Sequence, residues 1–77
     1  MQSSEPAVLR WDRVIHKGVR TKDGLPLGNI ASEEPDAIVV LGIKSRVYKI
    51  PKSRVESFDG SQVLVDIPAK ETGGYLV

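Results

Sequence analysis

Four turn signals divide the chain into short apolar runs, and this punctuation limits the possible folds more than any other feature of the sequence. Two of the signals are Asp-Gly pairs, Asp23-Gly24 and Asp59-Gly60. In such a pair the glycine tolerates a positive φ, and the aspartate can bond to its own downstream backbone. The other two signals are Glu34-Pro35-Asp36 and the segment 42–45. Turn signals about every eight to twelve residues, without sustained helical periodicity between them, are typical of a β protein.

The apolar runs between these turns predict about six strands, at residues 13–21, 27–32, 37–43, 46–50, 55–58 and 62–67. Pro51 interrupts the pattern because proline cannot donate to a strand ladder, and we expect one short helical turn near residues 51–54 with Pro51 at its first position. Residues 1–8 and 70–77 are expected to be flexible tails around a domain at 9–69. The prediction is an all-β fold, a small antiparallel β-barrel of about six strands.

A chain of 77 residues without cysteine has neither a disulfide nor a thiolate metal site. An unstapled fold of this size is usually a compact barrel or bundle, or it is completed by a partner. The net charge of +1 gives no general attraction to nucleic acid. Residues 1–6 are polar and short, unlike a signal peptide or a membrane span, so we expect a cytoplasmic location.

The strand expected at 37–43 is apolar on both faces, because residues 37, 39, 41 and 43 on one face and residues 38 and 40 on the other are all aliphatic. We predict that the barrel interior holds the odd-numbered side chains of this strand and of the strand at 62–67: Val39, Leu41, Val63 and Val65. A strand that is apolar on both faces needs two covers, whereas a small barrel has one interior. The second face therefore requires another cover.

This second face predicts a homodimer. Ile38 and Val40 would point outward, next to Leu64 if the two strands are adjacent, and a monomer should cover such a patch. A twofold dimer does so most simply, although segment 9–11 or 75–77 of the same chain is the alternative cover. Trp11 is a further interface candidate because tryptophan is enriched at binding hot spots; its alternative role is to fill one end of the core.

Basic side chains gather in two stretches, residues 10–22 and 44–54. They support an alternative function, a β-barrel that binds RNA, and the candidate contacts are Arg13, Lys17, Arg20, Lys44, Arg46, Tyr48 and Lys49. Tyr48 would share a strand face with Arg46 and provide a surface on which bases stack. The simpler interpretation of both stretches is solvated strand surface.

No residue set in the sequence predicts catalysis, a metal or a cofactor. His16 is the single histidine, and a general base needs an orienting partner and a nucleophile within reach. The acidic turn at 33–36 lacks the ligand spacing of a calcium loop. The glycines do not form a phosphate-binding loop at a helix start. We therefore expect a protein that is not an enzyme.

Two segments resemble PRC-barrel domains. Residues 17–30, KGVRTKDGLPLGNI, are similar to the opening of these domains: a short strand, an Asp-Gly turn, and a glycine in the second strand. Gly28 would let that strand bend or let another backbone approach closely. Residues 48–55, YKIPKSRV, resemble the family's segment in which a strand ends in a proline turn.

The resemblance spans about residues 11–68 and implies the fold together with a binding role. Family members include ribosome-maturation factors that bind a ribosomal protein, the cytoplasmic domain of the photosynthetic reaction-centre H subunit, and archaeal cell-division adaptors. The chain looks most like the small stand-alone archaeal or bacterial members. We therefore predict a non-enzymatic, self-associating adaptor in a larger cytoplasmic assembly such as RNA-processing or cell-division machinery, with an unidentified protein partner.

Overall fold

The computed structural model describes Val8 and residues 10–77, and this part of the chain is mostly β. Its strands are β1 (Gly18–Arg20), β2 (Pro26–Glu33), β3 (Ala37–Leu41), β4 (Val47–Pro51), β5 (Val55–Phe58) and β6 (Gln62–Val65). Its short 3-10 helices are η1 (Trp11–Val14), η2 (Ile43–Ser45), η3 (Lys52–Arg54) and η4 (Ala69–Tyr75). The six strands form one sheet in the order β4-β3-β2-β1-β6-β5.

Both predicted Asp-Gly turns are confirmed. Gly24 and Gly60 have φ values of 83° and 97°, in the left-handed region that favours glycine. In the β5–β6 turn, the Asp59 carboxylate accepts hydrogen bonds from the backbone N–H groups of Gln62 and Ser61, at 2.8 and 2.9 Å. These bonds stabilise the charged form and lower the pKa of Asp59. The local chemistry of the turn thus sets the hairpin.

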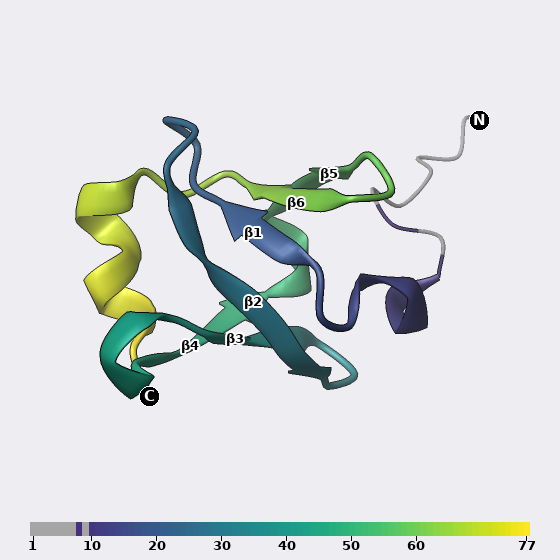
Figure 1. The fold of residues 1–77 in the computed structure, drawn as a ribbon, viewed down its shortest axis with the longest axis horizontal. Coiled ribbons are helices and arrows are strands. Elements are labelled where there is room, and N and C mark those ends of the chain that lie inside the picture. The colour runs from purple at the N-terminus through teal and green to yellow at the C-terminus, as the bar shows by residue number, and fades with distance from the viewer. Residues whose placement is uncertain (1–7, 9) are drawn as a thin grey trace.

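The sheet differs from the predicted antiparallel barrel in two respects. β1 pairs with β6 in parallel, with Val19 opposite Val63, whereas the other four strand pairs are antiparallel. The sheet is not closed, because β4 and β5 lie at its two edges. It bends instead, so that β3 and β4 lie in one layer and β5 and β6 in the other, with β2 crossing between them (Figure 1). Hairpin turns determine only neighbouring pairs, and the β1–β6 pair forms because it buries Val19 and Val63 together.

The first predicted strand is largely wrong. Residues 13–14 of the strand expected at 13–21 belong to η1 instead, and His16 has a φ of 69°, which interrupts extended backbone. β1 therefore begins only at Gly18. The other five strands lie within two residues of their predicted bounds. The helical turn expected near 51–54 is confirmed as η3, but Pro51 ends β4 and is the N-cap of η3, so its predicted place at the first helical position is wrong.

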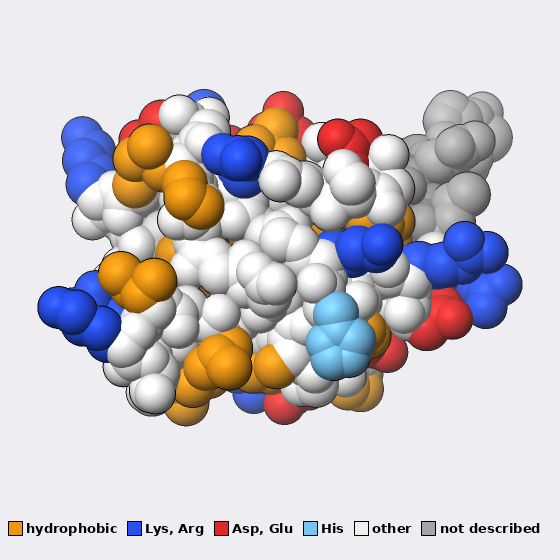
Figure 2. Space-filling model, viewed as in Figure 1, with side chains coloured by type: hydrophobic (Ala, Val, Ile, Leu, Met, Phe, Trp, Pro, Cys, Tyr) orange, Lys and Arg blue, Asp and Glu red, His pale blue; other side chains and the backbone are white. Residues whose placement is uncertain are grey.

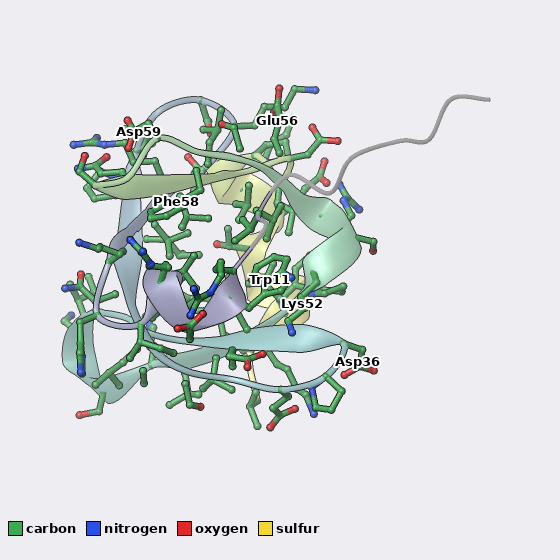
Figure 3. The ribbon with its side chains drawn as sticks, turned by 90° about the vertical axis from the view of Figure 1, so that its right-hand side faces the viewer. Trp11, Asp36, Lys52, Glu56, Phe58 and Asp59 are labelled. Carbon is green, nitrogen blue, oxygen red and sulfur yellow. The ribbon has the colours of Figure 1, made fainter. Side chains whose placement is uncertain are left out.

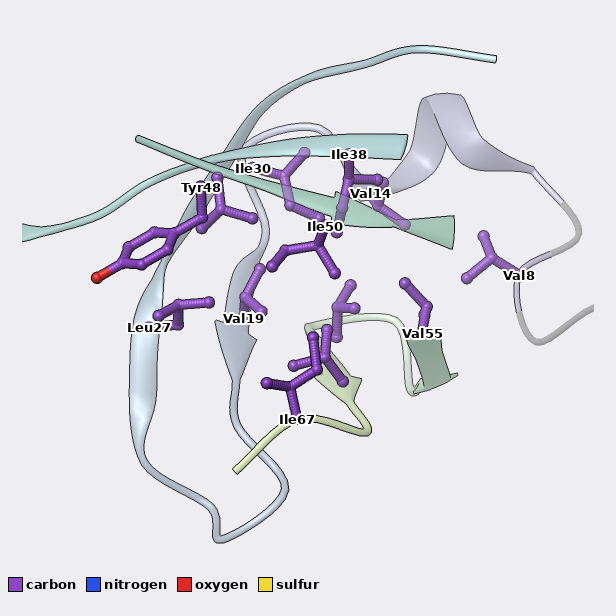
Figure 4. Close-up of a cluster of buried hydrophobic side chains, with 13 residues drawn as sticks. Val8, Val14, Val19, Leu27, Ile30, Ile38, Tyr48, Ile50, Val55 and Ile67 are labelled. Carbon is purple, nitrogen blue, oxygen red and sulfur yellow. The ribbon is translucent and has the colours of Figure 1, made fainter. Parts of the chain in front are cut away.

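The core fills the space between the two layers of the bent sheet (Figure 4). Its buried side chains are Val8, Val14, Val19, Leu27, Ile30, Ile38, Val40, Tyr48, Ile50, Val55, Val63, Val65 and Ile67. The predicted interior positions of Val63 and Val65 are confirmed, since both side chains are fully buried.

The two short helices η1 and η4 lie at opposite ends of the bent sheet, as Figure 1 shows at its right and left sides. Residues 70–77, expected as a flexible tail, belong to η4 and to a short bridge between Leu76 and Tyr48 of β4. Of the tail expected at 1–8, residues 1–7 lie outside the described part of the chain, while Val8 is buried in the core.

Candidate protein-interaction face

The two faces of β3 are the reverse of those predicted. Ile38 and Val40 are fully buried, whereas the side chain of Leu41 is 49% exposed. The register explains the difference, because Ile38 lies opposite Ile50 of β4 and Val40 lies opposite Tyr48, and both partners are buried. Ile38 and Val40 therefore belong to the core and do not form the outward patch that we predicted from them.

The solvent side of the β3–β4 hairpin is mostly aliphatic, with Lys49 opposite Val39 as its charged side chain. Four side chains, which we name the outer aliphatic face, lie there: Val39, Leu41, Val47 and Val77. Leu41 is opposite Val47, and the N–H group of Val77 donates to the carbonyl oxygen of Val47 at 2.9 Å. Val77 is 83% exposed and Leu41 is about half exposed. Little else in the described chain therefore covers the row formed by Leu41, Val47 and Val77. Hydrophobic side chains line the lower margin of the molecule beneath this hairpin in Figure 2.

The hairpin carries opposite charges at its two ends. Lys44 and Arg46 lie in the turn between β3 and β4, whereas Glu34 and Asp36 lie in the turn between β2 and β3. The Glu34 carboxylate forms a 2.9 Å ion pair with Lys49 Nζ, and this hydrogen-bonded pair raises the pKa of Lys49. Lys44, Arg46 and Asp36 form no ion pair with any residue that the structure describes.

Two glycines let β2 approach the end of β3 and hold Leu41 in place. A Cβ atom added at Gly28 would overlap the carbonyl oxygen of Leu41 and would lie 2.8 Å from the Cα of Gly42. A Cβ atom at Gly42 would lie 2.9 Å from the carbonyl oxygen of Leu27. The close backbone approach expected at Gly28 is therefore confirmed, and it supports one end of the outer aliphatic face.

Trp11 occupies one end of the core. It lies in η1, is half-buried and packs against the core cluster. Lys52 Nζ lies 4.7 Å from the centre of a Trp11 ring and 2.6 Å from the Glu33 carboxylate. Figure 3 shows this arrangement, with Trp11 between the two layers and Lys52 beside it. These contacts favour the core-filling role for Trp11 over that of an interface anchor.

Leu64 does not lie beside β3. It is half-buried on β6, and two strands, β2 and β1, separate β6 from β3 in the sheet. The adjacency that we expected between Leu64 and the outward side chains of β3 is therefore wrong.

Three of the seven candidate nucleic-acid contacts are occupied by contacts within the chain. Tyr48 is only 6% exposed and forms part of the core, so its ring offers no face to a base. Lys49 is paired with an acid, as described above. The Arg20 guanidinium donates to the side chain of Gln62 and, at 2.7 Å, to the carbonyl oxygen of Gly24.

The other four candidates fall into two separate places. Arg13 lies in η1 and Lys17 just before β1, at the end of the molecule that is on the right in Figure 1. Lys44 and Arg46 lie at the opposite end, beside η2. The structure therefore does not bring the two basic stretches together on one surface.

His16 is exposed beside a shallow hollow of about 430 Å³. Besides His16, the hollow is lined by Asn29, Ile30, Ala31, Leu41 and Gly42, none of which is an acid, a base or a nucleophile. The His16 backbone N–H donates to the carbonyl oxygen of Ile30 at 2.7 Å. Among the described residues, no group of three or more His, Cys, Asp or Glu side chains is placed to hold a metal ion.

Comparison of the chain with models of known protein families and with curated protein sequences finds no match. No helix in the described part of the chain is long and apolar enough to span a membrane. The interpretation of the site therefore depends on the geometry of the face itself.

All four members of the outer aliphatic face were missed from the sequence: Val39 and Leu41 were expected inside, and Val47 and Val77 belonged to no predicted patch. Val77 was assigned to a tail, and no local pattern links it to β4, which lies about thirty residues earlier in the chain. The alternation Val47, Lys49, Pro51 against Tyr48, Ile50 was visible in the sequence. It indicates two faces, but not which of them meets solvent.

Proposed function

We propose that this chain is a non-enzymatic protein-interaction module that acts as an adaptor in a larger cytoplasmic assembly, such as RNA-processing or cell-division machinery, and that associates with itself. The outer aliphatic face carries the proposal. Its aliphatic side chains stand side by side on the solvent surface of a sheet whose other surface forms the core. Contiguous exposed apolar patches on small proteins mark interaction sites far more often than isolated apolar residues do.

A likeness to PRC-barrel domains is part of this proposal. Its support consists of the two Asp-Gly turns, the close backbone approach at Gly28 and the helical turn that follows Pro51. Because the sheet of this chain is open, the proposal concerns the family's pattern of strands and turns and its adaptor role.

The surroundings of His16 support a non-enzymatic role. Acid–base or nucleophilic catalysis needs at least two reactive groups within hydrogen-bond reach of one another. The side chains around His16 that line the same hollow supply an amide, three aliphatic or small groups and a glycine backbone.

Sedimentation of three proteins tests the proposed face. The wild type should sediment with more than the monomer mass at high micromolar concentration. Leu41→Asp should remain a monomer with a nearly unchanged melting temperature, because a half-exposed carboxylate is tolerated in the monomer but is costly when an interface buries it.

The matched control is Leu25→Asp, the same change at a leucine of similar exposure in the β1–β2 turn, outside the outer aliphatic face. It should associate as the wild type does. A wild type that is monomeric at high micromolar concentration, or a Leu41→Asp protein that associates normally, would contradict the proposal.

RNA binding is the second candidate function, and the observation that favours it is the absence of ion pairs at Lys44 and Arg46 within the described chain. If these two residues contact phosphates, the logarithm of RNA affinity should fall with the logarithm of salt concentration with a slope of about −0.7 per contact. Lys44→Ala with Arg46→Ala should then reduce the slope by about 1.4. An affinity that does not depend on salt or on these residues would exclude this function for the turn.

A further inference from the structure

The outer aliphatic face lies between two turns of opposite charge. At one end, Lys44 and Arg46 contribute two positive charges that no described residue neutralises. At the other end, Glu34 and Asp36 contribute two negative charges, of which Lys49 neutralises one through its pair with Glu34. The face therefore has a direction, from a basic end to an acidic end.

We propose that the partner of this face is a second copy of the chain, packed face to face about a twofold axis with the two β3–β4 hairpins antiparallel. In this arrangement the axis passes near Val39, the middle residue of β3, and Lys44 and Arg46 of each copy lie against Asp36 and Glu34 of the other. The inference rests on the proposed self-association, to which it adds the orientation of the two copies.

The length of the hairpin makes the orientation selective. The five residues of β3 span about 17 Å, and the two charged turns lie beyond its ends. The Debye length at physiological ionic strength is about 8 Å, so each turn responds mainly to the turn that faces it. Two hairpins stacked in parallel would place basic turn on basic turn and acidic turn on acidic turn. A twofold axis that lies in the plane of the interface, perpendicular to the hairpin, exchanges the two ends and brings opposite charges together at both.

The aliphatic and charged parts of the face have different tasks. Val39, in the middle of β3, and Leu41 and Val47, at the end beside the basic turn, lose water on both copies and supply most of the binding free energy. Charges at the rim contribute little affinity, but they accelerate the encounter and disfavour the wrong orientation. Asp36 is the principal acidic partner, because Glu34 is already paired with Lys49.

Two charge-reversal variants test the orientation. The basic-turn variant carries Lys44→Glu and Arg46→Glu, and the acidic-turn variant carries Glu34→Lys and Asp36→Lys. In each variant both turns have the same sign, so self-association should weaken by about tenfold or more in sedimentation equilibrium. An equimolar mixture of the two variants should form a heterodimer at least as tight as the wild-type dimer, because both contacts are attractive again.

A third variant, Arg13→Glu with Lys70→Glu, matches the charge change of the basic-turn variant at an arginine of η1 and a lysine of η4 that are exposed and form no ion pair with any described residue. Alone, it should associate as the wild type does. Mixed with the acidic-turn variant, it should give the same result as the wild type in that mixture. All samples are treated with nuclease, so that nucleic acid cannot bridge two copies. If each charge variant associates like the wild type while Leu41→Asp does not, the proposed face stands and the antiparallel orientation is wrong. If the wild type is monomeric, both proposals fail.

The absence of cysteine from the chain allows a second, geometric measurement. Lys44→Cys and Asp36→Cys are made as separate single variants, and both positions are exposed. Under mild oxidation the mixture should give a disulfide-linked heterodimer far faster than either variant alone gives a homodimer. Faster linkage of Lys44→Cys to itself would contradict the antiparallel arrangement.

Discussion

At the scale of single residues, Gly28 determines how closely two strands approach. Its φ of 157° and the backbone of Leu41 and Gly42 leave no room for a Cβ atom. Gly60 has a positive φ as well, but nothing lies within 4 Å of the place where its Cβ atom would be. A substitution at Gly60 would therefore meet only an unfavourable φ. A substitution at Gly28 would meet an unfavourable φ and also a collision with the backbone of β3.

Gly28→Ala should lower the free energy of unfolding by about 2–4 kcal/mol, because the new methyl group forces β2 away from β3 in addition to straining φ. Gly60→Ala, which strains φ alone, should cost about 1 kcal/mol. Urea unfolding followed by far-UV circular dichroism measures both values. Equal effects of the two substitutions would show that the close approach at Gly28 does not contribute to the free energy of unfolding.

At the scale of elements, β3 decides which side of the hairpin is core and which is surface. Side chains alternate along a strand, so a shift of one residue exchanges the whole set on each face. β3 is aliphatic on both faces, and its own sequence is compatible with either orientation. The pairing of β3 with β4 selects one, because Tyr48 and Ile50 lie on the same side as Val40 and Ile38.

Two adjacent valines provide a matched test of this orientation. Val40→Ala removes fully buried methyl groups and should destabilise the protein by about 2–3 kcal/mol. Val39→Ala removes half-buried methyl groups on the outer aliphatic face and should cost about 0.5–1 kcal/mol. Urea unfolding at low protein concentration, where association does not contribute, measures both. If Val39→Ala destabilised the protein more than Val40→Ala, the orientation first predicted from the sequence would be correct.

At the scale of the whole molecule, one strand pair joins the two layers of the bent sheet. β1 pairs in parallel with β6, and Gly18 lies opposite Gln62, more than forty residues away along the chain. The ends of the core are then covered by η1, which contains Trp11, and by η4. Elements from both ends of the chain thus depend on a single core.

This topology predicts slow and cooperative folding. Loop closure must precede the β1–β6 contacts, so refolding should take milliseconds to seconds, not microseconds. Trp11 is the single tryptophan and packs against the core, so its fluorescence reports formation of the core in stopped-flow refolding. Denaturant unfolding followed by Trp11 fluorescence and by far-UV circular dichroism should give the same midpoint. Different midpoints would show that η1 separates from the core before the sheet unfolds.

The turns and the β class of this protein follow from local sequence. The Asp-Gly pairs at residues 23–24 and 59–60 act through the φ of glycine and through hydrogen bonds to neighbouring residues. The turns that they form can therefore be predicted without the rest of the chain. Five of the six strands followed from these turns and from Pro51.

Long-range packing selected the parallel β1–β6 pair, the open sheet, the buried face of β3 and the place of Val77 on β4. Each of these depends on contacts between residues that are distant in the sequence or on a choice between two equally apolar faces. Such choices are made by the burial of the whole core, which no single segment specifies. For this reason the sequence predicted that an aliphatic surface would exist on β3, but the packing of β4 and of residues 76–77 decided which side chains compose it.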